Sequence, residues 1–254
     1  MKEDSKAVGA EGERLNKFIS NTGYCSRRKA DELIFMGLVK VNDKVVDSPG
    51  YRVKSSDRVN VEGHKIKHAA KQYILLNKTK DAISTVSDER DRKTVMDLIE
   101  GACEEAVYPV GRLDRNTTGL LILTNDGELA NRLSHPSSEV RKVYKARLDK
   151  RLSYDDLKKI REGIMLEDGF AQVDEIEYSK TDGDDSVVLT LHSGRNRIVR
   201  RIFEALEYKV KALDRVGYAG LTLHHLPRGA WRYLTADEVR KLSASGQSKK
   251  SNRI

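Results

Sequence analysis

Asp114 is the residue of this sequence that is best placed to do chemistry. It lies between Arg112 and Arg115, in a segment that begins at Gly111 and that leads, after Gly119, into an apolar run. An acid on a loop that a buried strand holds in place is a common arrangement in functional sites. A surface aspartate in a turn is the alternative. A phosphate-binding loop is excluded, because the glycines lack the required spacing and no Gly-Lys-Ser/Thr follows.

A second group of interest is basic. Arg27, Arg28 and Lys29 follow Ser26, a residue that could cap a helix. Cations in the first helical turn oppose the positive partial charge of that helix end. A bound phosphate would relieve this repulsion, since helix N-termini and arginines both bind phosphate. A solvated charged surface explains the same residues equally well.

The first part of the chain predicts a small α+β unit over residues 13–64, after a flexible polar tail over 1–12. Leu15, Phe18 and Ile19 have the spacing of an amphipathic helix, and a second helix is expected from Ser26 to Gly37. Lys44–Val46 is the second strand of an expected hairpin, and a further strand, Arg58–Val61, follows. We expect residues 65–71, which are polar and show no period, to be a linker.

The second part, residues 72–241, predicts a larger domain that mixes strands and helices. Strands are expected at Tyr73–Leu76, at Leu120–Leu123 and around the alternating residues Val187, Leu189 and Leu191. Helical spacing is present at Thr94–Ile99 and from Ile198 to Leu206. Residues 242–254, with basic residues among serines, are expected to be a flexible basic tail.

The composition limits the kinds of partner and compartment. The 254 residues carry a formal net charge of +8, which favours a polyanionic partner. No apolar run reaches the roughly 20 residues of a membrane helix, and no signal peptide is evident. The only two cysteines form no CxxC pair, as is usual in a reducing cytoplasm, so we expect a cytoplasmic protein. The histidines have no neighbouring ligands at a metal-binding spacing, so no metal is expected.

Two stretches near the start resemble a known RNA-binding fold. They are R-L-N-K-F-I-S-N-T-G-Y-C-S-R-R-K-A-D-E-L-I and G-L-V-K-V-N-D-K-V-V, within Arg14 to about Glu62. They are similar to the small domain named after small-subunit ribosomal protein four, which presents basic side chains to structured RNA. The resemblance implies RNA binding by Arg14, Lys17, Ser26, Arg27, Arg28 and Lys29.

Four ordered blocks from Tyr73 to about Leu242 resemble bacterial ribosomal RNA pseudouridine synthases. The branch is that of the type A enzymes for small-subunit RNA and the type B, E and F enzymes for large-subunit RNA. The blocks are G-R-L-D-R-N-T-T-G-L-L-I-L-T-N-D-G, V-Y-K-A, S-G-R-N-R-I-V-R-R and L-P-R-G-A-W-R-Y-L-T. The further segments G-E-L-A-N-R-L-S-H-P-S and L-E-D-G are most similar to the type B enzymes. The resemblance implies an α+β fold: the RNA-binding module, then a synthase domain with a mixed, mainly antiparallel sheet and flanking helices.

The same resemblance implies a chemistry and assigns residues to it. Uridine becomes pseudouridine when its glycosidic carbon–nitrogen bond breaks, the uracil turns, and its carbon 5 joins the ribose. No electrons or groups are exchanged, so no cofactor is expected. Asp114 is the implied catalytic carboxylate, as nucleophile or base, Tyr144 stacks on the uracil, and Arg200 favours the ionised form of Asp114. Patterning alone would make Tyr144 a core residue, and it does not prefer Arg200 over Arg201.

Other features of the sequence have more than one interpretation. Arg112 and Arg115 could contact the RNA or be ordinary surface charges. Relatives usually have Lys-Pro-x-Gly where this chain has Lys78-Thr79-Lys80-Asp81, which implies a different loop conformation. We expect a monomer whose partner is ribosomal RNA, with the large-subunit RNA as the expected target. The alternatives are a small-subunit target or a non-catalytic assembly factor that binds RNA.

Overall fold

The computed structural model describes residues 12–67 and 69–245. The chain divides into two compact units, Met1–Lys71 with Cys103–Val107, and Gln72–Ala102 with Tyr108–Ile254. The tail expected over 1–12 lies outside the described residues except for Gly12. In the described part of the chain, no helix has the length and apolar character that a membrane span requires.

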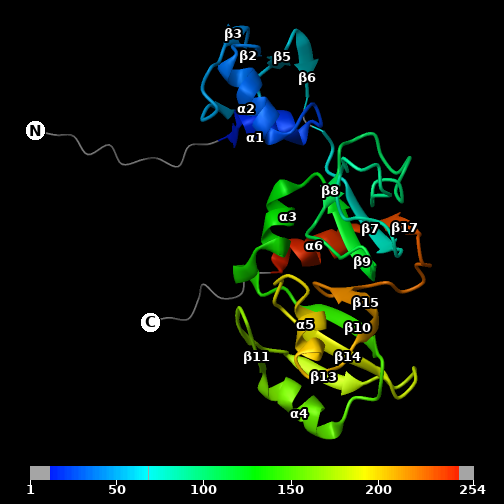
Figure 1. The fold of residues 1–254 in the computed structure, drawn as a ribbon. Coiled ribbons are helices and arrows are strands. Elements are labelled where there is room, and N and C mark those ends of the chain that lie inside the picture. The colour runs from blue at the N-terminus through cyan, green and yellow to red at the C-terminus, as the bar shows by residue number, and fades with distance from the viewer. Residues whose placement is uncertain (1–11, 68, 246–254) are drawn as a thin grey trace, which may run out of the picture. The chain divides into compact units, whose positions relative to one another are not determined.

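The N-terminal unit packs two helices against short strands (Figure 1). Ser26 caps the second helix, since its hydroxyl accepts a hydrogen bond from the Lys29 N–H at 3.2 Å, as expected. Asn42 and Asp43 both have positive φ angles, the geometry of a tight hairpin turn. The elements are β1 (Glu13–Arg14), α1 (Leu15–Asn21), α2 (Arg27–Phe35), β2 (Val39–Val41), β3 (Lys44–Val45), β4 (Arg52–Val53), β5 (Val59–Val61) and β6 (His64–Ile66).

Strand β6 occupies the beginning of the segment that was expected to be a linker. It pairs antiparallel with β5, and together they complete a sheet in the order β3-β2-β5-β6. Three residues are too few to show an alternating pattern in the sequence, and the pairing with β5 comes from tertiary structure. The expected linker over 65–71 was therefore wrong at its first two residues.

The larger unit is built on one mixed, mainly antiparallel sheet, as expected. Its strands follow the order β13-β14-β10-β15-β9-β7-β17, and β8 and β16 pair with β9 and β15. The strands are β7 (Tyr73–Lys78), β8 (Tyr108–Pro109), β9 (Thr117–Thr124), β10 (Lys142–Leu148), β13 (Glu175–Tyr178), β14 (Ser186–Leu191), β15 (Val210–Tyr218), β16 (Leu221–Thr222) and β17 (Trp231–Tyr233). A separate hairpin consists of β11 (Ile164–Leu166) and β12 (Gly169–Ala171).

One parallel pairing in this sheet decides where the site is built. Strands β15 and β9 run parallel, with Leu213 opposite Thr117 and Arg215 opposite Gly119. The beginnings of β9 and β15 therefore lie at the same edge of the sheet. Residues that precede β9, including Asp114, are thus brought to the place where the chain enters β15 from the preceding helix.

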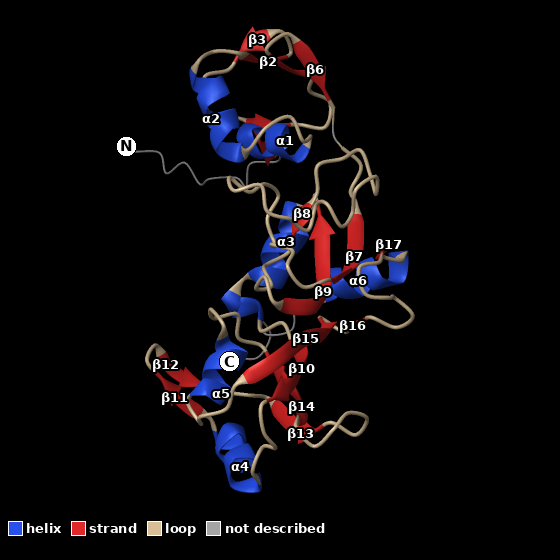
Figure 2. Cartoon of the chain, turned by 45° about the vertical axis from the view of Figure 1, so that its right-hand side comes forward, coloured by secondary structure: helices blue, strands red, loops and turns tan. Residues whose placement is uncertain are grey.

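Helices cover this sheet (Figures 1 and 2). Side chains of α3 and α6 join the hydrophobic core with those of β7 and β9, whereas α5 contacts β11 and β15 and α4 contacts β13. Asp126 caps α3 by accepting hydrogen bonds from the Glu128 and Leu129 N–H groups. The helices are α3 (Gly127–Ser134), the 3-10 helix η1 (Pro136–Ser138), α4 (Tyr154–Glu162), α5 (Ile198–Glu204) and α6 (Ala236–Ala244).

Two expectations for this unit were wrong. Thr94–Ile99 forms bends and turns rather than a helix: Thr94 is bridged to Ile83, and the Asp97 carboxylate accepts hydrogen bonds from the Thr94 N–H and hydroxyl. Such side-chain bonds to the backbone compete with helix formation. The basic tail does not begin at residue 242, because α6 continues to Ala244 and Leu242 is 0% exposed. Residues 246–254 of that tail lie outside the described residues.

Candidate active site

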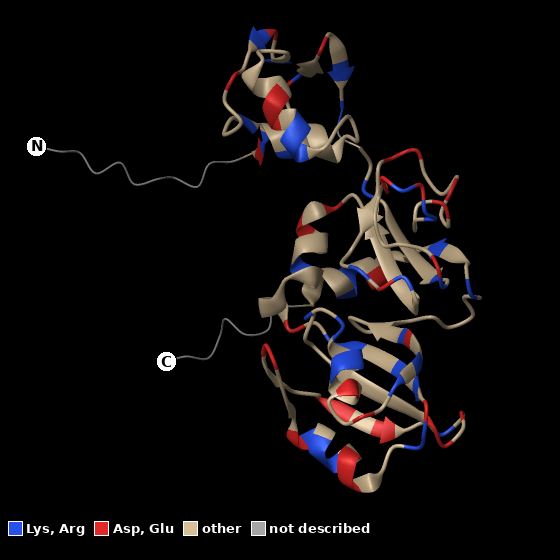
Figure 3. Cartoon of the chain, viewed as in Figure 1, with Lys and Arg blue, Asp and Glu red and all other residues tan. Residues whose placement is uncertain are grey.

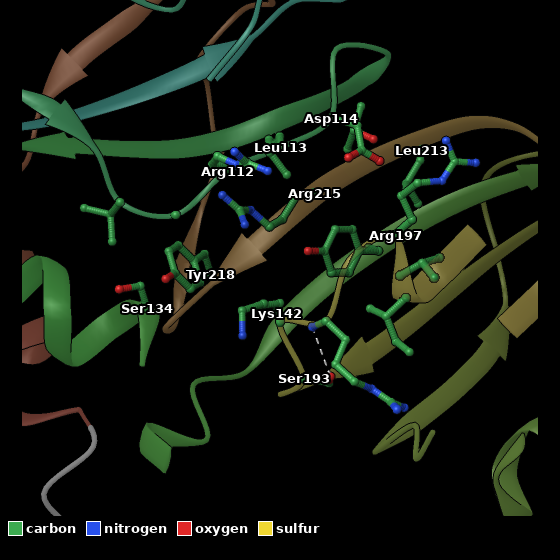
Figure 4. Close-up of a pocket in the computed structure, with 18 residues that line it drawn as sticks. Arg112, Leu113, Asp114, Ser134, Lys142, Ser193, Arg197, Leu213, Arg215 and Tyr218 are labelled. Atoms are coloured by element: carbon green, nitrogen blue, oxygen red, sulfur yellow. Dashed lines mark hydrogen bonds between the residues drawn. The ribbon is translucent and has the colours of Figure 1, made fainter. Parts of the chain in front are cut away.

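A pocket of about 150 Å³ opens beside Asp114 (Figure 4). Its walls come from the loop that carries Asp114, from strands β10 and β15, and from the segment that leads into α5. Asp114 and Tyr144 both line this pocket, and the Asp114 side chain is 41% exposed. The structure thus brings together a carboxylate that solvent can reach and an aromatic ring, although the two residues are 30 positions apart in the sequence.

The backbone of the Asp114 loop is held by a buried ammonium group. Lys78 is 0% exposed, and in the part of the chain that the structure describes its Nζ donates hydrogen bonds only to main-chain carbonyls. Burial lowers the pKa of Lys78 to about 8. These bonds replace the water that the charge loses on burial. The acceptors are Thr79 O at 3.1 Å, Asp114 O at 3.2 Å, Arg115 O at 3.3 Å and Thr117 O at 2.9 Å.

A second contact fixes the residue just before Asp114. The buried hydroxyl of Ser84 accepts a hydrogen bond from Leu113 N–H at 3.1 Å and donates one to Leu113 O at 3.0 Å. Asp81 N–H donates to Arg115 O at 3.0 Å on the other side of Asp114. The stretch that departs from the usual Lys-Pro-x-Gly pattern therefore supports the Asp114 loop. Asp81 has a φ of +62°, a conformation that glycine prefers and that aspartate tolerates.

Arg200 reaches Asp114 from the helix α5. Its Nε lies 4.0 Å from Asp114 Oδ2, and its Nη1 donates a hydrogen bond to Val210 O at 2.9 Å. Val210 is the first residue of β15, so the guanidinium is tied to the edge where β9 and β15 begin. Arg201 instead pairs with Asp168. The structure thus separates the two arginines that sequence patterning left equivalent.

Tyr144 lies on β10 directly opposite Arg215 of β15. Residues that face each other across two paired strands point to the same side of the sheet, so both side chains enter the pocket. The Tyr144 side chain is 9% exposed and shares its face with the buried residues Ala146 and Leu148. It therefore has the environment of a core tyrosine and also contributes to the pocket.

The residues expected to bind RNA fall into separate groups. Arg112 lines the pocket, whereas Arg115 does not and instead pairs with Asp81 at 3.1 Å.

Basic residues also occupy the first turn of α2 in the N-terminal unit (Figure 3). There Arg27 and Arg28 are exposed and form no ion pair among the described residues, and Lys29 pairs with Glu32 at 2.9 Å. Near them in sequence are Ser26, the helix cap, Arg14 of β1, and Lys17, which pairs with Glu13 at 3.3 Å.

Other pocket residues were not found from the sequence. Lys142 and Arg215 line the pocket from β10 and β15, and Arg195 and Arg197 line it from the segment before α5. Lys142 could have been found, because it is two residues from Tyr144 on the same strand face. Arg215 gave no signal, since an arginine in a strand normally marks a solvent-facing position. No three His, Cys, Asp or Glu side chains converge into a metal-binding arrangement in the part of the chain that the structure describes.

Comparison with known proteins identifies the class of enzyme. The family model described as RNA pseudouridylate synthase matches residues 72–205, and the S4 domain model matches residues 13–59. The chain therefore belongs to the RNA pseudouridylate synthase family and is an enzyme that carries an N-terminal S4 domain. The resemblance noted in the sequence is confirmed.

Individual relatives cover nearly the whole chain. It is 44% identical over 235 residues to the ribosomal large subunit pseudouridine synthase B of Bacillus subtilis, a match that covers 91% of this chain and 96% of the relative. An uncharacterised RNA pseudouridine synthase of Aquifex aeolicus is 44% identical over 90% of this chain and 93% of its own length. A pseudouridylate synthase of known crystal structure matches with a TM-score of 0.63 and 29% identity, over 90% of this chain and 99% of that one.

Proposed function

We propose that this protein isomerises a uridine of large-subunit ribosomal RNA to pseudouridine, with Asp114 as the catalytic carboxylate. The observation that carries the proposal is that Asp114 and Tyr144 line one pocket of a pseudouridylate synthase domain and that Arg200 pairs with Asp114 there. The large-subunit target is supported by the similarity to the Bacillus subtilis enzyme. We place the reaction in the cytoplasm and expect a monomer that needs no cofactor.

The reaction requires each of the three side chains in a definite role. The N1–C1′ bond of uridine breaks, a C1′–C5 bond forms, the proton on C5 is lost, and N1 gains a proton. Asp114 starts this sequence as a nucleophile or a base, and Arg200 places a positive charge 4.0 Å from its carboxylate. Tyr144 stacks on the uracil once the nucleotide has left its helix, a step that costs a few kcal/mol. Because the net change is an isomerisation, no oxidant or group donor is consumed.

Pseudouridine mapping of ribosomal RNA tests the proposal. A strain that lacks the gene should lack one modification in its large-subunit RNA, and the wild-type gene should restore it. The Asp114→Asn variant keeps the shape of the side chain but lacks the charge, and its rate on the purified RNA should fall by about 10²-fold or more.

Other outcomes assign the protein to the alternatives. Equal restoration by Asp114→Asn would refute the role of the carboxylate. A missing modification in the small-subunit RNA would change the target, and no missing modification would favour an assembly factor.

A further inference from the structure

Two cations that line the pocket, Arg215 and Lys142, are at least partly buried and have no ion pair with a carboxylate among the described residues. Arg215 is 3% exposed, and its Nε donates a hydrogen bond to Leu120 O at 2.8 Å. Its Nη2 is buried and has no hydrogen-bond partner among the described residues. The centre of the guanidinium lies 4.6 Å from the centroid of the Tyr218 ring. A buried donor with no partner loses the hydration that the unfolded chain provides, which is costly for a charged group.

Lys142 is the second of these cations. Its Nζ donates to Val140 O at 3.2 Å and to His192 O at 2.6 Å, which leaves one of its three protons without an acceptor among the described residues. Burial, followed by repulsion from Arg215, lowers the pKa of Lys142 to about 8, against the opposing effect of Asp174. Two like charges thus share one end of the pocket, and among the described residues neither forms an ion pair with a carboxylate.

The other basic residues near the pocket differ from this pair. Arg195 pairs with Asp168, Arg197 with Glu204, and Arg200 with Asp114. Arg112 lines the pocket but is exposed, so water can satisfy its charge. Figure 4 shows Arg215 and Lys142 projecting from neighbouring strands toward the part of the pocket that Tyr218 borders. Arg215 and Lys142 are therefore the pocket cations whose charge neither a carboxylate of the described residues nor full exposure to water compensates.

We propose that Arg215 and Lys142 form an anion subsite that takes a backbone phosphate of the RNA, beside the uridine that Asp114 and Tyr144 hold. This inference rests on the proposed function. A phosphate fits better than a uracil carbonyl, because the uracil is neutral and two positive charges require a negative partner. Since Arg215 faces Tyr144 directly across paired strands, this phosphate belongs to the nucleotide stacked on Tyr144 or to its immediate neighbour.

Binding of uridine and of uridine 5′-monophosphate to the full-length protein, followed by NMR, tests the subsite. The two probes differ only in the phosphate, and one charge-assisted contact should make the monophosphate bind roughly tenfold more tightly. Lys142→Gln should reduce this preference to about threefold or less. Lys145→Gln is the matched control, because Lys145 lies on the same strand, outside the pocket, and pairs with Asp182. It should keep the full preference.

Equal binding of the two probes to the wild type, or an unchanged preference in Lys142→Gln, would overturn the subsite. If circular dichroism shows that Lys142→Gln does not fold, Arg215→Gln provides the same comparison. Asp114→Asn separates this inference from the proposed function, since it should lose isomerisation and keep the preference for the monophosphate. A wild type that prefers the monophosphate but isomerises no uridine would retain the subsite and refute the proposed function.

Discussion

Lys78 shows how a single buried residue can hold the backbone of a loop that carries the proposed catalytic carboxylate. Its ammonium group binds the carbonyl oxygens of Asp114 and of three neighbouring residues, so it fixes the backbone from which the carboxylate projects. The lowered pKa of Lys78 reflects the energetic cost of keeping this charge away from water. The same residue therefore links the geometry of the site to the dependence of stability on pH.

Lys78→Met should reduce the isomerisation rate by about tenfold or more while RNA binding changes little, because the Asp114 loop loses its anchor. Lys80→Met is the matched control, since Lys80 lies two residues after Lys78, just beyond the end of β7, and is exposed. It should leave the rate unchanged. Single-turnover kinetics with the purified RNA measures the difference, and a Lys78→Met enzyme as fast as the Lys80→Met enzyme would contradict the anchoring role.

Lys78→Met should also change how the free energy of unfolding depends on pH. Above about pH 8 the folded protein releases the Lys78 proton, whereas the unfolded chain holds it up to about pH 10.4, so the unfolded state binds more protons. The free energy of unfolding should therefore rise between about pH 8 and 9.5, by up to about 1.4 kcal/mol per pH unit for this group. In urea unfolding, the Lys78→Met variant should lose the part of this pH dependence that comes from Lys78. It should keep the part that comes from Lys142, whose pKa is also lowered to about 8. An identical slope in wild type and variant would be inconsistent with a buried charged lysine.

At the scale of elements, the parallel pairing of β9 with β15 requires a glycine. Gly119 has a φ of +103°, and a Cβ there would lie 2.3 Å from Arg215 O and 2.4 Å from Asp214 Oδ1. No other residue lets the two strands approach so closely. The close approach sets the register that places the beginnings of both strands, and with them Asp114 and Arg200, at one edge of the sheet.

Gly119→Ala should lower the free energy of unfolding by about 2–4 kcal/mol, from strain in φ and from the clash with β15. Gly220→Ala separates the two causes, since Gly220 has a φ of +83° and nothing within 4 Å of an added Cβ. Its cost should be about 1–2 kcal/mol, that of the left-handed conformation alone. Urea unfolding measures both, and equal losses would show that the strands can separate without cost.

Periodicity predicted those elements whose own residues carry the pattern, and it failed where tertiary contacts decide. The stripe Leu15, Phe18 and Ile19 and the run Leu120–Leu123 identified α1 and β9 from the sequence. The helix expected at Thr94–Ile99 was lost to hydrogen bonds from Asp97 and to the bridge with Ile83. For the site, the quoted motifs brought Asp114, Tyr144 and Arg200 to attention. The roles of Lys78, Ser84 and Arg215 depend on contacts across strands and could not be predicted.

At the scale of the whole molecule, the S4 domain and the pocket beside Asp114 belong to separate compact units. The S4 domain has its own hydrophobic core and presents Arg27 and Arg28, both exposed and without a carboxylate partner among the described residues. The synthase domain carries the pocket. Substitution of these two arginines should therefore affect the affinity for RNA and leave the chemical step in the synthase domain unchanged.

Replacing both Arg27 and Arg28 by alanine should weaken RNA binding and reduce the salt dependence of the binding constant. Each phosphate contact contributes about 0.7 to 0.9 to the slope of log K against log salt, so loss of two contacts should lower the slope by about 1.4 to 1.8. Lys65→Ala is the control, because Lys65 is an exposed cation on β6 of the same domain and is not among the residues expected to bind RNA. Titrations at several salt concentrations provide the slopes, and a double variant with the wild-type slope would remove these arginines from the RNA interface.

The hydrogen bonds that hold Lys78 and Arg200 end on main-chain oxygen atoms. Every amino acid supplies such an oxygen, so the side chains at positions 79, 115, 117 and 210 can be exchanged during evolution without removing an acceptor. The sequence constraint that these hydrogen bonds impose therefore falls on Lys78 and Arg200 themselves. Descendants of this gene can diverge widely around the site and still inherit the orientation of its carboxylate.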